Sequence, residues 1–218
     1  MKILMIIVLV FNFNIQLNGQ DVSMRSKNFE AMNVTIEEVL YQSKNAIRLK
    51  EIIKDQESIA LAKDIQFTDG TIEVELAGRP LPSANSTARG FIGIAFRVKI
   101  KDSIRYDCFY LRPTNGRAED QVRRNHSTQY IAHPAYPWFR LRKEFSDMYE
   151  SYVDLIEGEW TKIKIEVNGK QAKLYVHDSV QPSLIINNLL NSELSGGVAL
   201  WNGQGTEGYF RNLKIINH

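Results

Sequence analysis

The sequence has little cysteine. Its single Cys108 excludes a disulfide bond within the chain, and one cysteine with four histidines does not show the ligand spacing of a zinc site. Stability must therefore come from the burial of side chains. Because no neighbour in the sequence would activate the thiol, we interpret Cys108 as a small semi-buried side chain rather than a nucleophile. No cofactor is predicted, although loop carbonyls and scattered Asp residues are compatible with a structural calcium ion.

The sequence contains one long apolar run, at the start of the chain. Residues 3–13 are mostly apolar, but a bilayer span needs roughly 20 residues, so this run does not predict a membrane span. Lys2 before the run and the small Gly19 after it are typical of a secretory signal peptide. The sequence therefore predicts a signal peptide over residues 1–19 and a secreted or periplasmic domain over residues 20–218.

The chain has no large excess of charge of either sign. Its formal net charge is +2 at pH 7, which gives no support to non-specific attraction to nucleic acid or to a membrane surface. The charges are nevertheless segregated, because a basic stretch, 112–143, is followed by acidic residues spread over 144–159. We expect the acidic segment to lie back over the basic one, and a simple solvated face is the alternative.

Many short alternating runs separated by turns, with almost no helical signal, predict an all-β fold. The expected strands cover residues 46–53, 58–63, 71–76, 92–100, 105–112, 159–167, 171–178, 196–201 and 209–215. Asn168-Gly169 is a strong hairpin turn between two of them. We expect one domain, a two-sheet antiparallel β-sandwich of the jelly-roll type.

Three segments lack a clear strand pattern. Residues 29–43 give a mixed signal, compatible with a strand leading into a short helical turn, and their conformation is left open. Residues 78–88 are rich in Pro, Ser and Asn and are expected to form a loop. Residues 135–158 are expected to form an irregular, aromatic-rich excursion, and long structured loops often carry function.

Two strands, 92–100 and 105–112, carry the main functional signal. In each, apolar residues alternate with small, aromatic or cationic ones, so one face would join the core and the other would stay available for binding. Antiparallel pairing would place two arginines beside an aromatic surface. The side chains predicted to share this outward face of one sheet are Glu73, Arg97, Tyr110 and Arg112.

A pair of carboxylates, Glu73 and Glu75, is the candidate catalytic pair. A retaining glycosidase needs two carboxyl groups about 5–5.5 Å apart, and residues two apart on a strand lie about 6.6–6.8 Å apart at the backbone. The two side chains could therefore converge on one sugar. The alternative is that residues 71–76 merely alternate between the core and a solvated face.

Aromatic and cationic residues around the central strands are typical of a glycan-binding surface. Aromatic rings pack on the apolar faces of sugar rings, and Arg and Gln side chains form directed hydrogen bonds to hydroxyl pairs or carboxylates. The candidate ligand-binding residues are Arg97, Tyr110, Arg112, Arg124, His126, Gln129, Tyr130 and Trp138. The alternative is that the arginines form cross-strand ion pairs while the aromatic rings fill the core.

The order of several sequence blocks carries a resemblance to a known family. These blocks are FTDGTIEVELAG, GFIGIAFR, YDCFYLRP, QYIAHPAYPWFRLRKEF, EWTKIKIEVNGKQAKLYV and GGVALWNGQGTEGYFRNLKI. Together they resemble secreted single-domain members of the concanavalin A-like lectin/glucanase superfamily, over roughly residues 67–216. More narrowly, they resemble a branch related to laminin-G-like modules and to 3-keto-disaccharide hydrolase-type domains.

The resemblance implies a concanavalin A-like jelly roll that binds carbohydrate on its concave sheet. Laminarinase-type members carry Glu-x-Asp-x-x-Glu on one strand, whereas this chain has Glu73-Val74-Glu75-Leu76-Ala77-Gly78, without the third carboxylate. We therefore expect a carbohydrate-binding or accessory module for an oligo- or polysaccharide, anionic ones included. The alternatives are a glycoside hydrolase (glucanase-like or 3-keto-disaccharide hydrolase-like) or lyase, and a protein-interaction module of laminin-G type.

Overall fold

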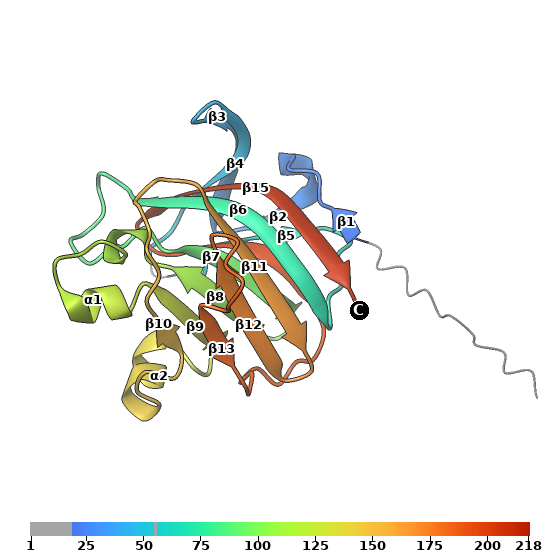
Figure 1. Cartoon of the computed structure of the whole chain (residues 1–218). Helices are drawn as coiled ribbons and strands as arrows, with labels where there is room; N and C mark the ends of the chain where they lie inside the picture. The colour runs from blue at the N-terminus through green and yellow to red at the C-terminus, as the bar shows by residue number, and fades with distance from the viewer. Residues whose placement is uncertain (1–18, 55) are drawn as a thin grey trace, which may run out of the picture.

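The protein is a sandwich of two antiparallel sheets (Figure 1). The computed structural model describes residues 19–54 and 56–218. The predicted all-β, two-sheet architecture is confirmed. The signal-peptide prediction falls on residues 1–18, outside the described part of the chain, except for Gly19, which begins the first strand.

One sheet has eight strands, and both ends of the described chain lie in it. In spatial order it contains β13 (Leu184–Ile186), β12 (Gln171–Val176), β11 (Thr161–Asn168), β6 (Gly70–Pro80), β15 (Thr206–Asn217), β4 (Lys44–Glu51) and β3 (Val34–Tyr41), with β1 (Gly19–Asp21) paired to β15. The predicted hairpin at Asn168-Gly169 joins β11 to β12, and Gly169 has the positive φ of 56° that such a turn requires.

The other sheet has seven strands and carries the short helices at one end. Its spatial order is β10 (Glu150–Ser151), β9 (Thr128–His133), β8 (Ile104–Leu111), β7 (Ile92–Ile100), β14 (Gly197–Asn202), β5 (Ile59–Ala62) and β2 (Phe29–Met32). Helix α1 (Gln121–Asn125) lies between β8 and β9 in the chain, and helix α2 (Trp138–Glu144) follows β9. Figure 1 shows α2 beneath β9 and β10, and the two helices flank this sheet.

The core lies between the sheets and is built by the apolar halves of the alternating strands. Buried members include Ile72, Val74, Leu76, Ile94, Phe96, Phe109, Leu111, Ile163 and Ile165. Each of these residues was expected to point inward because its strand neighbours are polar, small or aromatic. The core prediction for these strands is therefore confirmed.

Three segments differ from their sequence-based description. Residues 29–43, left open above, form β2 and the whole of β3, without a helical turn. The expected loop at 78–88 begins only after Pro80, since β6 continues to that residue. The excursion 135–158 is not wholly irregular, because α2 begins after Pro137, whose φ of −69° and ψ of 161° mark the residue before the helix, and buries Leu141.

Candidate functional site

The two candidate catalytic carboxylates lie on the eight-stranded sheet, away from the aromatic strands. Glu73 and Glu75 share the outer face of β6, as the alternation predicted, while the residues between them are buried. Tyr110 belongs to β8, in the other sheet. The prediction that Glu73 and Tyr110 project from one face of one sheet is therefore wrong. Its physical cause is that the loop after Pro80 carries the chain from one layer of the sandwich to the other.

The surroundings of Glu75 are those of a structural carboxylate. The side-chain amide of Asn212 donates to Glu75 Oε1 at 2.6 Å. Arg211 Nε and Lys44 Nζ lie 3.5 and 4.0 Å from Glu75 Oε2. Glu73 borders a shallow hollow of ≈ 200 Å³ whose lining includes Lys162 and Tyr175.

Arg97 points into the sandwich rather than away from it. Its φ of 53° and a register shift between Phe96 and Lys99 mark a β-bulge in β7. A bulge adds one residue and so reverses the alternation beyond it. The Arg97 side chain is only 1% exposed. It donates to three acceptors next to the ends of β6 and β11 in the opposite sheet: Thr68 O (2.9 Å), Asp69 Oδ1 (2.9 Å) and Gly169 O (2.8 Å). The assignment of Arg97 to a ligand site is therefore wrong, since this residue ties the two sheets together.

Two further candidates fall outside the site. Tyr130 is fully buried on the core side of β9, where its hydroxyl donates to Asp107 and accepts from Leu190 N at 2.7 Å. Its place opposite the core residue Phe109 in the sheet explains this orientation. Arg124 lies on the exposed side of α1 and contacts Tyr152, with 2.9 Å between Nη2 and the hydroxyl.

The remaining candidates converge on one cluster around Arg112. Arg112 Nη2 donates to Tyr110 Oη at 2.8 Å and to Gln129 Oε1 at 3.0 Å. Its Nη1 donates to the carbonyl of His126 at 3.0 Å. The guanidinium carbon also lies 5.9 Å from the centre of the Trp138 ring. Five residues selected from the sequence, spread over residues 110–138, thus meet at the end of β8.

Two residues missing from the sequence-based set complete this cluster. Glu150, at the start of β10, places Oε2 3.1 Å from Arg112 Nη1 and 2.9 Å from His126 Nδ1. Arg142, on α2, donates to both carboxylate oxygens of Glu150 at 2.7 and 2.6 Å. The opposite charge of the segments 112–143 and 144–159 had indicated that they pack together. The ion pair between Arg117 and Asp154, at 2.7 Å, confirms the same trend nearby.

The electrostatics of the cluster favour a permanently charged Glu150. Burial raises the pKa of this carboxyl, but hydrogen bonds from Arg142 and the charges of Arg112 and Arg142 outweigh that effect and hold the pKa below its ordinary value. Burial lowers the pKa of His126, partly offset by the charge of Glu150, so the imidazole is neutral at physiological pH. We call these seven residues (Tyr110, Arg112, His126, Gln129, Trp138, Arg142 and Glu150) the Arg112 cluster.

A row of residues paired across neighbouring strands runs from this cluster to β14. From β10 to β14 the register pairs Glu150 with Gln129, Gln129 with Tyr110, Tyr110 with Gly93, and Gly93 with Trp201. Residues opposite one another in neighbouring strands share a face. We call this side of the seven-stranded sheet, turned away from the core, the outer face.

Aromatic rings cover the outer face between the two ends of the row. The Tyr110 ring stacks on Trp201, with 4.9 Å between ring centres, and meets Phe91 edge-on at 6.1 Å. Only glycine fits at position 93 beneath these rings, because an added Cβ would lie 2.1 Å from the carbonyl oxygen of Phe109. The predicted aromatic residues thus lie over Gly93 on this face, but their rings are largely buried, with Tyr110 3% and Trp201 9% exposed.

A second polar group lies on the outer face at Glu57. Its carboxylate accepts from the Tyr106 hydroxyl, which in turn accepts from Trp201 Nε1 at 3.0 Å. His133 Nδ1 lies 3.4 Å from Glu57 Oε1, and the His133 ring stacks on Tyr106 at 4.9 Å. Burial lowers the pKa of His133, partly offset by Glu57, and burial raises that of Tyr106 well above its ordinary range.

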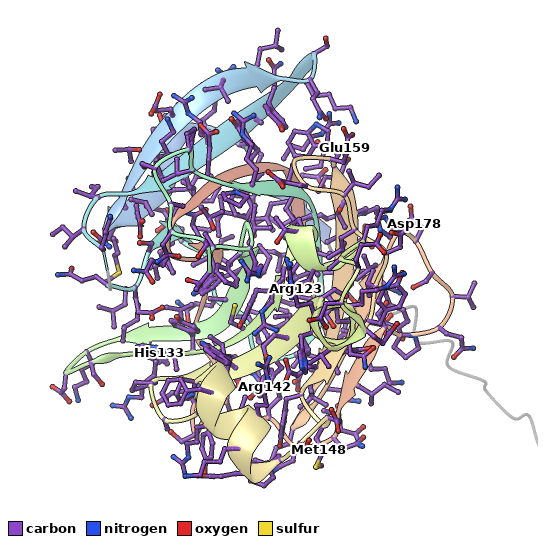
Figure 2. The ribbon with its side chains drawn as sticks, turned by 90° about the vertical axis from the view of Figure 1, so that its left-hand side faces the viewer. Arg123, His133, Arg142, Met148, Glu159 and Asp178 are labelled. Atoms are coloured by element: carbon purple, nitrogen blue, oxygen red, sulfur yellow. The ribbon has the colours of Figure 1, made fainter. Side chains whose placement is uncertain are left out.

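The side chains of the Arg112 cluster differ in solvent exposure, and only the exposed ones can contact a ligand directly. Arg112 is 5% exposed, and its contacts are all with protein groups. Trp138, by contrast, is 44% exposed. Arg142 is partly exposed, with its guanidinium carbon 4.9 Å from the Trp138 ring centre. In Figure 2, Arg142 on α2 lies below Arg123 on α1, with His133 to the left. Arg112 is thus a positioning residue, while Trp138 and Arg142 face solvent.

The described part of the chain contains neither a metal-binding cluster nor a helix that could span a membrane. No group of three or more His, Cys, Asp or Glu side chains within 19–54 and 56–218 is arranged to hold a metal ion. Neither helix in this part of the chain is long and apolar enough to cross a membrane. A second hollow, of ≈ 350 Å³, is lined in part by Trp160, Glu159 and His177. It lies at the start of β11, on the eight-stranded sheet.

Comparison with known proteins identifies the fold. No protein-family model matches the sequence, and the search of curated proteins found no match. Among solved structures, the carbohydrate-binding module CBM66 from Bacillus subtilis has a TM-score of 0.59 at 15% identity, over 86% of this chain and 95% of that one. The exoplasmic/lumenal domain of VIP36 in its Ca²⁺/Man3GlcNAc-bound form has a TM-score of 0.52 at 9% identity, over 87% and 84%.

The same fold also occurs in an enzyme. The Crh5 transglycosylase in complex with NAG has a TM-score of 0.52 at 10% identity, over 92% of this chain and 83% of that one. At these identities the likeness describes the fold and not the activity. The chain therefore has the two-sheet concanavalin A-like jelly-roll fold, which it shares with a carbohydrate-binding module, a domain solved with Man3GlcNAc and a transglycosylase.

Proposed function

We propose that the protein is a carbohydrate-binding or accessory module that binds an oligo- or polysaccharide on the outer face of the seven-stranded sheet. The observation that carries this proposal is the half-exposed Trp138 ring beside the guanidinium of Arg142. An indole ring packs on the apolar face of a pyranose, and a neighbouring Arg donates to its hydroxyl groups. The fold is one in which several similar structures bind sugars.

The arrangement also determines how Trp138 would be held for binding. The ring projects from the first residue of α2, and this helix is fastened to the sheet by the ion pair between Arg142 and Glu150. Arg112, behind it, joins the same carboxylate to β8 and β9. The binding surface is therefore preorganised, which reduces the entropy lost when the sugar binds.

The charge state of Glu150 favours binding over hydrolysis. A glycosidase needs a carboxylic acid that keeps its proton near neutral pH, which requires a raised pKa. The pKa of Glu150 is instead lowered by its two arginine partners. Glu73 and Glu75 lie on the other sheet and are separated from the aromatic layer by the core.

A glycan array with matched variants tests the proposal. We expect the wild-type protein to bind at least one glycan, and Trp138→Ala to weaken that binding roughly five- to tenfold, since an aromatic contact contributes on the order of 1–1.5 kcal/mol. Phe139→Ala is the matched control, because Phe139 is an aromatic residue 60% exposed on the same helix, with its ring 5.8 Å from the Trp138 ring centre. Equal binding by both variants would contradict the proposed site.

A parallel assay of reducing-sugar release separates a binding module from an enzyme. We expect no turnover of glycans that bind on the array. Turnover that Glu73→Gln abolishes would overrule the module proposal and make the chain a hydrolase.

Secretion belongs to the same proposal. We propose that residues 1–19 direct the chain to the secretory pathway and are then removed. The intact mass of the protein from a periplasmic or extracellular fraction tests this, and a mass that still includes residues 1–19 would contradict it.

A further inference from the structure

Arg89 and Arg123, which we call the cationic pair, both contact Thr114 in the short turn after β8. Arg89 lies two residues before Phe91, whose ring contacts Tyr110 in the aromatic layer. Both arginines flank Thr114 in the short turn after β8. Thr114 N donates to Arg89 O at 3.3 Å, and Arg123 Nη2 lies 3.4 Å from Thr114 O. The pair is therefore fixed beside the Arg112 cluster by the same turn.

This pair lacks the carboxylate partners that the neighbouring arginines have. The Arg89 guanidinium donates to the carbonyl oxygens of Ser86 and Ala88, at 2.6 and 2.9 Å. Arg123 reaches only Thr114 O and Asn115 Oδ1, at 3.4 and 3.5 Å, which is longer than the roughly 2.9 Å of a good hydrogen bond. Among the described residues, no Asp or Glu forms a salt bridge with either one. By contrast, Arg112, Arg117, Arg140 and Arg142 each have a carboxylate within 3.1 Å.

Polar atoms without partners lie at the same place. The hydroxyl of Thr114 and the Nε of Arg123 are buried and have no hydrogen-bond partner. The nearest acidic residue in the sequence, Asp120, uses its carboxylate to accept from the backbone N–H groups of Val122 and Arg123 at the start of α1. It therefore caps the helix instead of pairing with a guanidinium.

Electrostatics agree with the geometry. Burial lowers the pKa of Arg89, and the charges of Arg123 and Arg112 lower it further. Like charges held together without a counter-ion create a positive potential that attracts anions. An arginine fork matches the two oxygens of a carboxylate or sulfate group.

We infer that Arg89 and Arg123 bind an acidic substituent, a carboxylate or a sulfate ester, of the glycan whose sugar ring packs on the outer face. This inference rests on the proposed function and narrows it to an acidic polysaccharide. Arg89 is linked to the aromatic layer through the chain, because Phe91, two residues later, contacts the Tyr110 ring. Arg89 and Arg123 would thus bind the acidic group of the ligand, and Trp138 would pack on its sugar ring.

Titration calorimetry with matched probes tests the inference. The carboxylate arm compares oligogalacturonate with its neutral methyl ester, and the sulfate arm compares dextran sulfate with neutral dextran. We expect at least one acidic probe to bind tenfold or more tightly than its neutral counterpart, with an affinity that falls as salt is added. The arm that shows this difference identifies the acidic group.

Variants of Arg89 and Arg123 test whether these two residues cause the preference for acidic probes. Arg89→Gln with Arg123→Gln should remove the preference for the acidic probe, whereas Arg89→Lys with Arg123→Lys should keep part of it. Lys170→Gln with Lys173→Gln is the control for total charge, because both lysines are exposed on or next to β12 in the other sheet. The inference would be overturned if the double Arg→Gln variant kept the full acidic preference, or if the double Lys→Gln variant reduced that preference as much.

The outcomes also separate this inference from the proposed function. Binding to neutral glycans that needs Trp138 but not the arginine pair would overturn the inference and leave the proposed function standing. Acidic binding that needs the pair but not Trp138 would support the anion site and contradict the placement of the sugar. A wild-type protein that binds none of the probes and no glycan on the array would overturn both.

Discussion

The guanidinium of Arg112 and the carboxylate of Glu150 form a buried ion pair, with 3.1 Å between Nη1 and Oε2. Arg112 follows β8 and Glu150 begins β10, so the pair joins the end of one strand to the start of another across β9. Arg142, on α2, forms a second ion pair with the same carboxylate. This one acidic side chain therefore positions the helix that presents Trp138.

Glu150→Gln should destabilise the protein strongly. The change leaves the buried charge of Arg112 without its partner, and breaking a buried pair typically costs about 3–5 kcal/mol. The free energy of unfolding from urea denaturation measures this. Arg117→Gln is the matched control, because its pair with Asp154 is exposed and should contribute little. Equal, small effects of both variants would show that Glu150 does not organise the cluster.

Arg97 should matter for folding and not for binding. Arg97→Ala removes the three hydrogen bonds from β7 to the edge of the other sheet, so we expect a loss on the order of 3–5 kcal/mol in the free energy of unfolding. Glycan affinity, measured well below the unfolding temperature, should stay unchanged. Lys101→Ala, in the exposed turn after β7, is the control for loss of a positive charge. Weakened binding by a folded Arg97→Ala protein would restore this residue to the site.

Asp107 should make stability fall as the pH rises. Burial raises its pKa from 3.8 to about 6, against the opposing effects of Tyr130, Asn191 and Arg97. Since the folded state holds the proton more tightly than the unfolded chain, the stabilising contribution is complete below pH 4 and is lost as the pH rises through about 6.

Asp107→Asn should remove this pH dependence. Asn keeps an acceptor for the Tyr130 hydroxyl but carries no charge, so we expect the free energy of unfolding at pH 8 to rise by about 2–3 kcal/mol. Thermal denaturation at pH 4, 6 and 8 measures the difference between variant and wild type. Asp102→Asn, in the exposed turn after β7, should leave the profile unchanged. A profile of Asp107→Asn that parallels the wild type would contradict the assignment.

Glu73→Gln and Glu75→Gln should leave glycan affinity unchanged. Both residues lie on the outer face of the eight-stranded sheet, with the hydrophobic core between them and Trp138. Calorimetric titration with the best glycan from the array measures this. Weaker binding by either folded variant would place the ligand on the other sheet.

Alternation predicted which side chains are buried, but not which sheet a strand joins. The inward residues of β6 and β8 were predicted because polar or aromatic neighbours leave only one apolar face. The same pattern is produced by a strand in either layer, so Glu73 and Tyr110 were placed together although they lie in different sheets. The loop between β6 and β7 contains no signal for this crossing.

The β-bulge at Arg97 shows a second limit of the pattern. One extra residue reverses the direction of every later side chain in a strand, and the sequence around Arg97 alternates without interruption. Glu150 was missed for a different reason. Its charge was part of the predicted attraction between two segments, but only the three-dimensional structure shows which acidic residue meets Arg112.

The indole signals of the three tryptophans test the central claim most directly. Trp138 and Trp201 lie on the outer face, whereas Trp160 packs against Tyr41 on the eight-stranded sheet. In ¹⁵N–¹H spectra recorded while the best-binding glycan is added, we expect the Trp138 side-chain signal to shift most, Trp201 less, and Trp160 to stay in place. A shift of Trp160 with Trp138 unmoved would contradict the claim that the seven-stranded sheet carries the binding site.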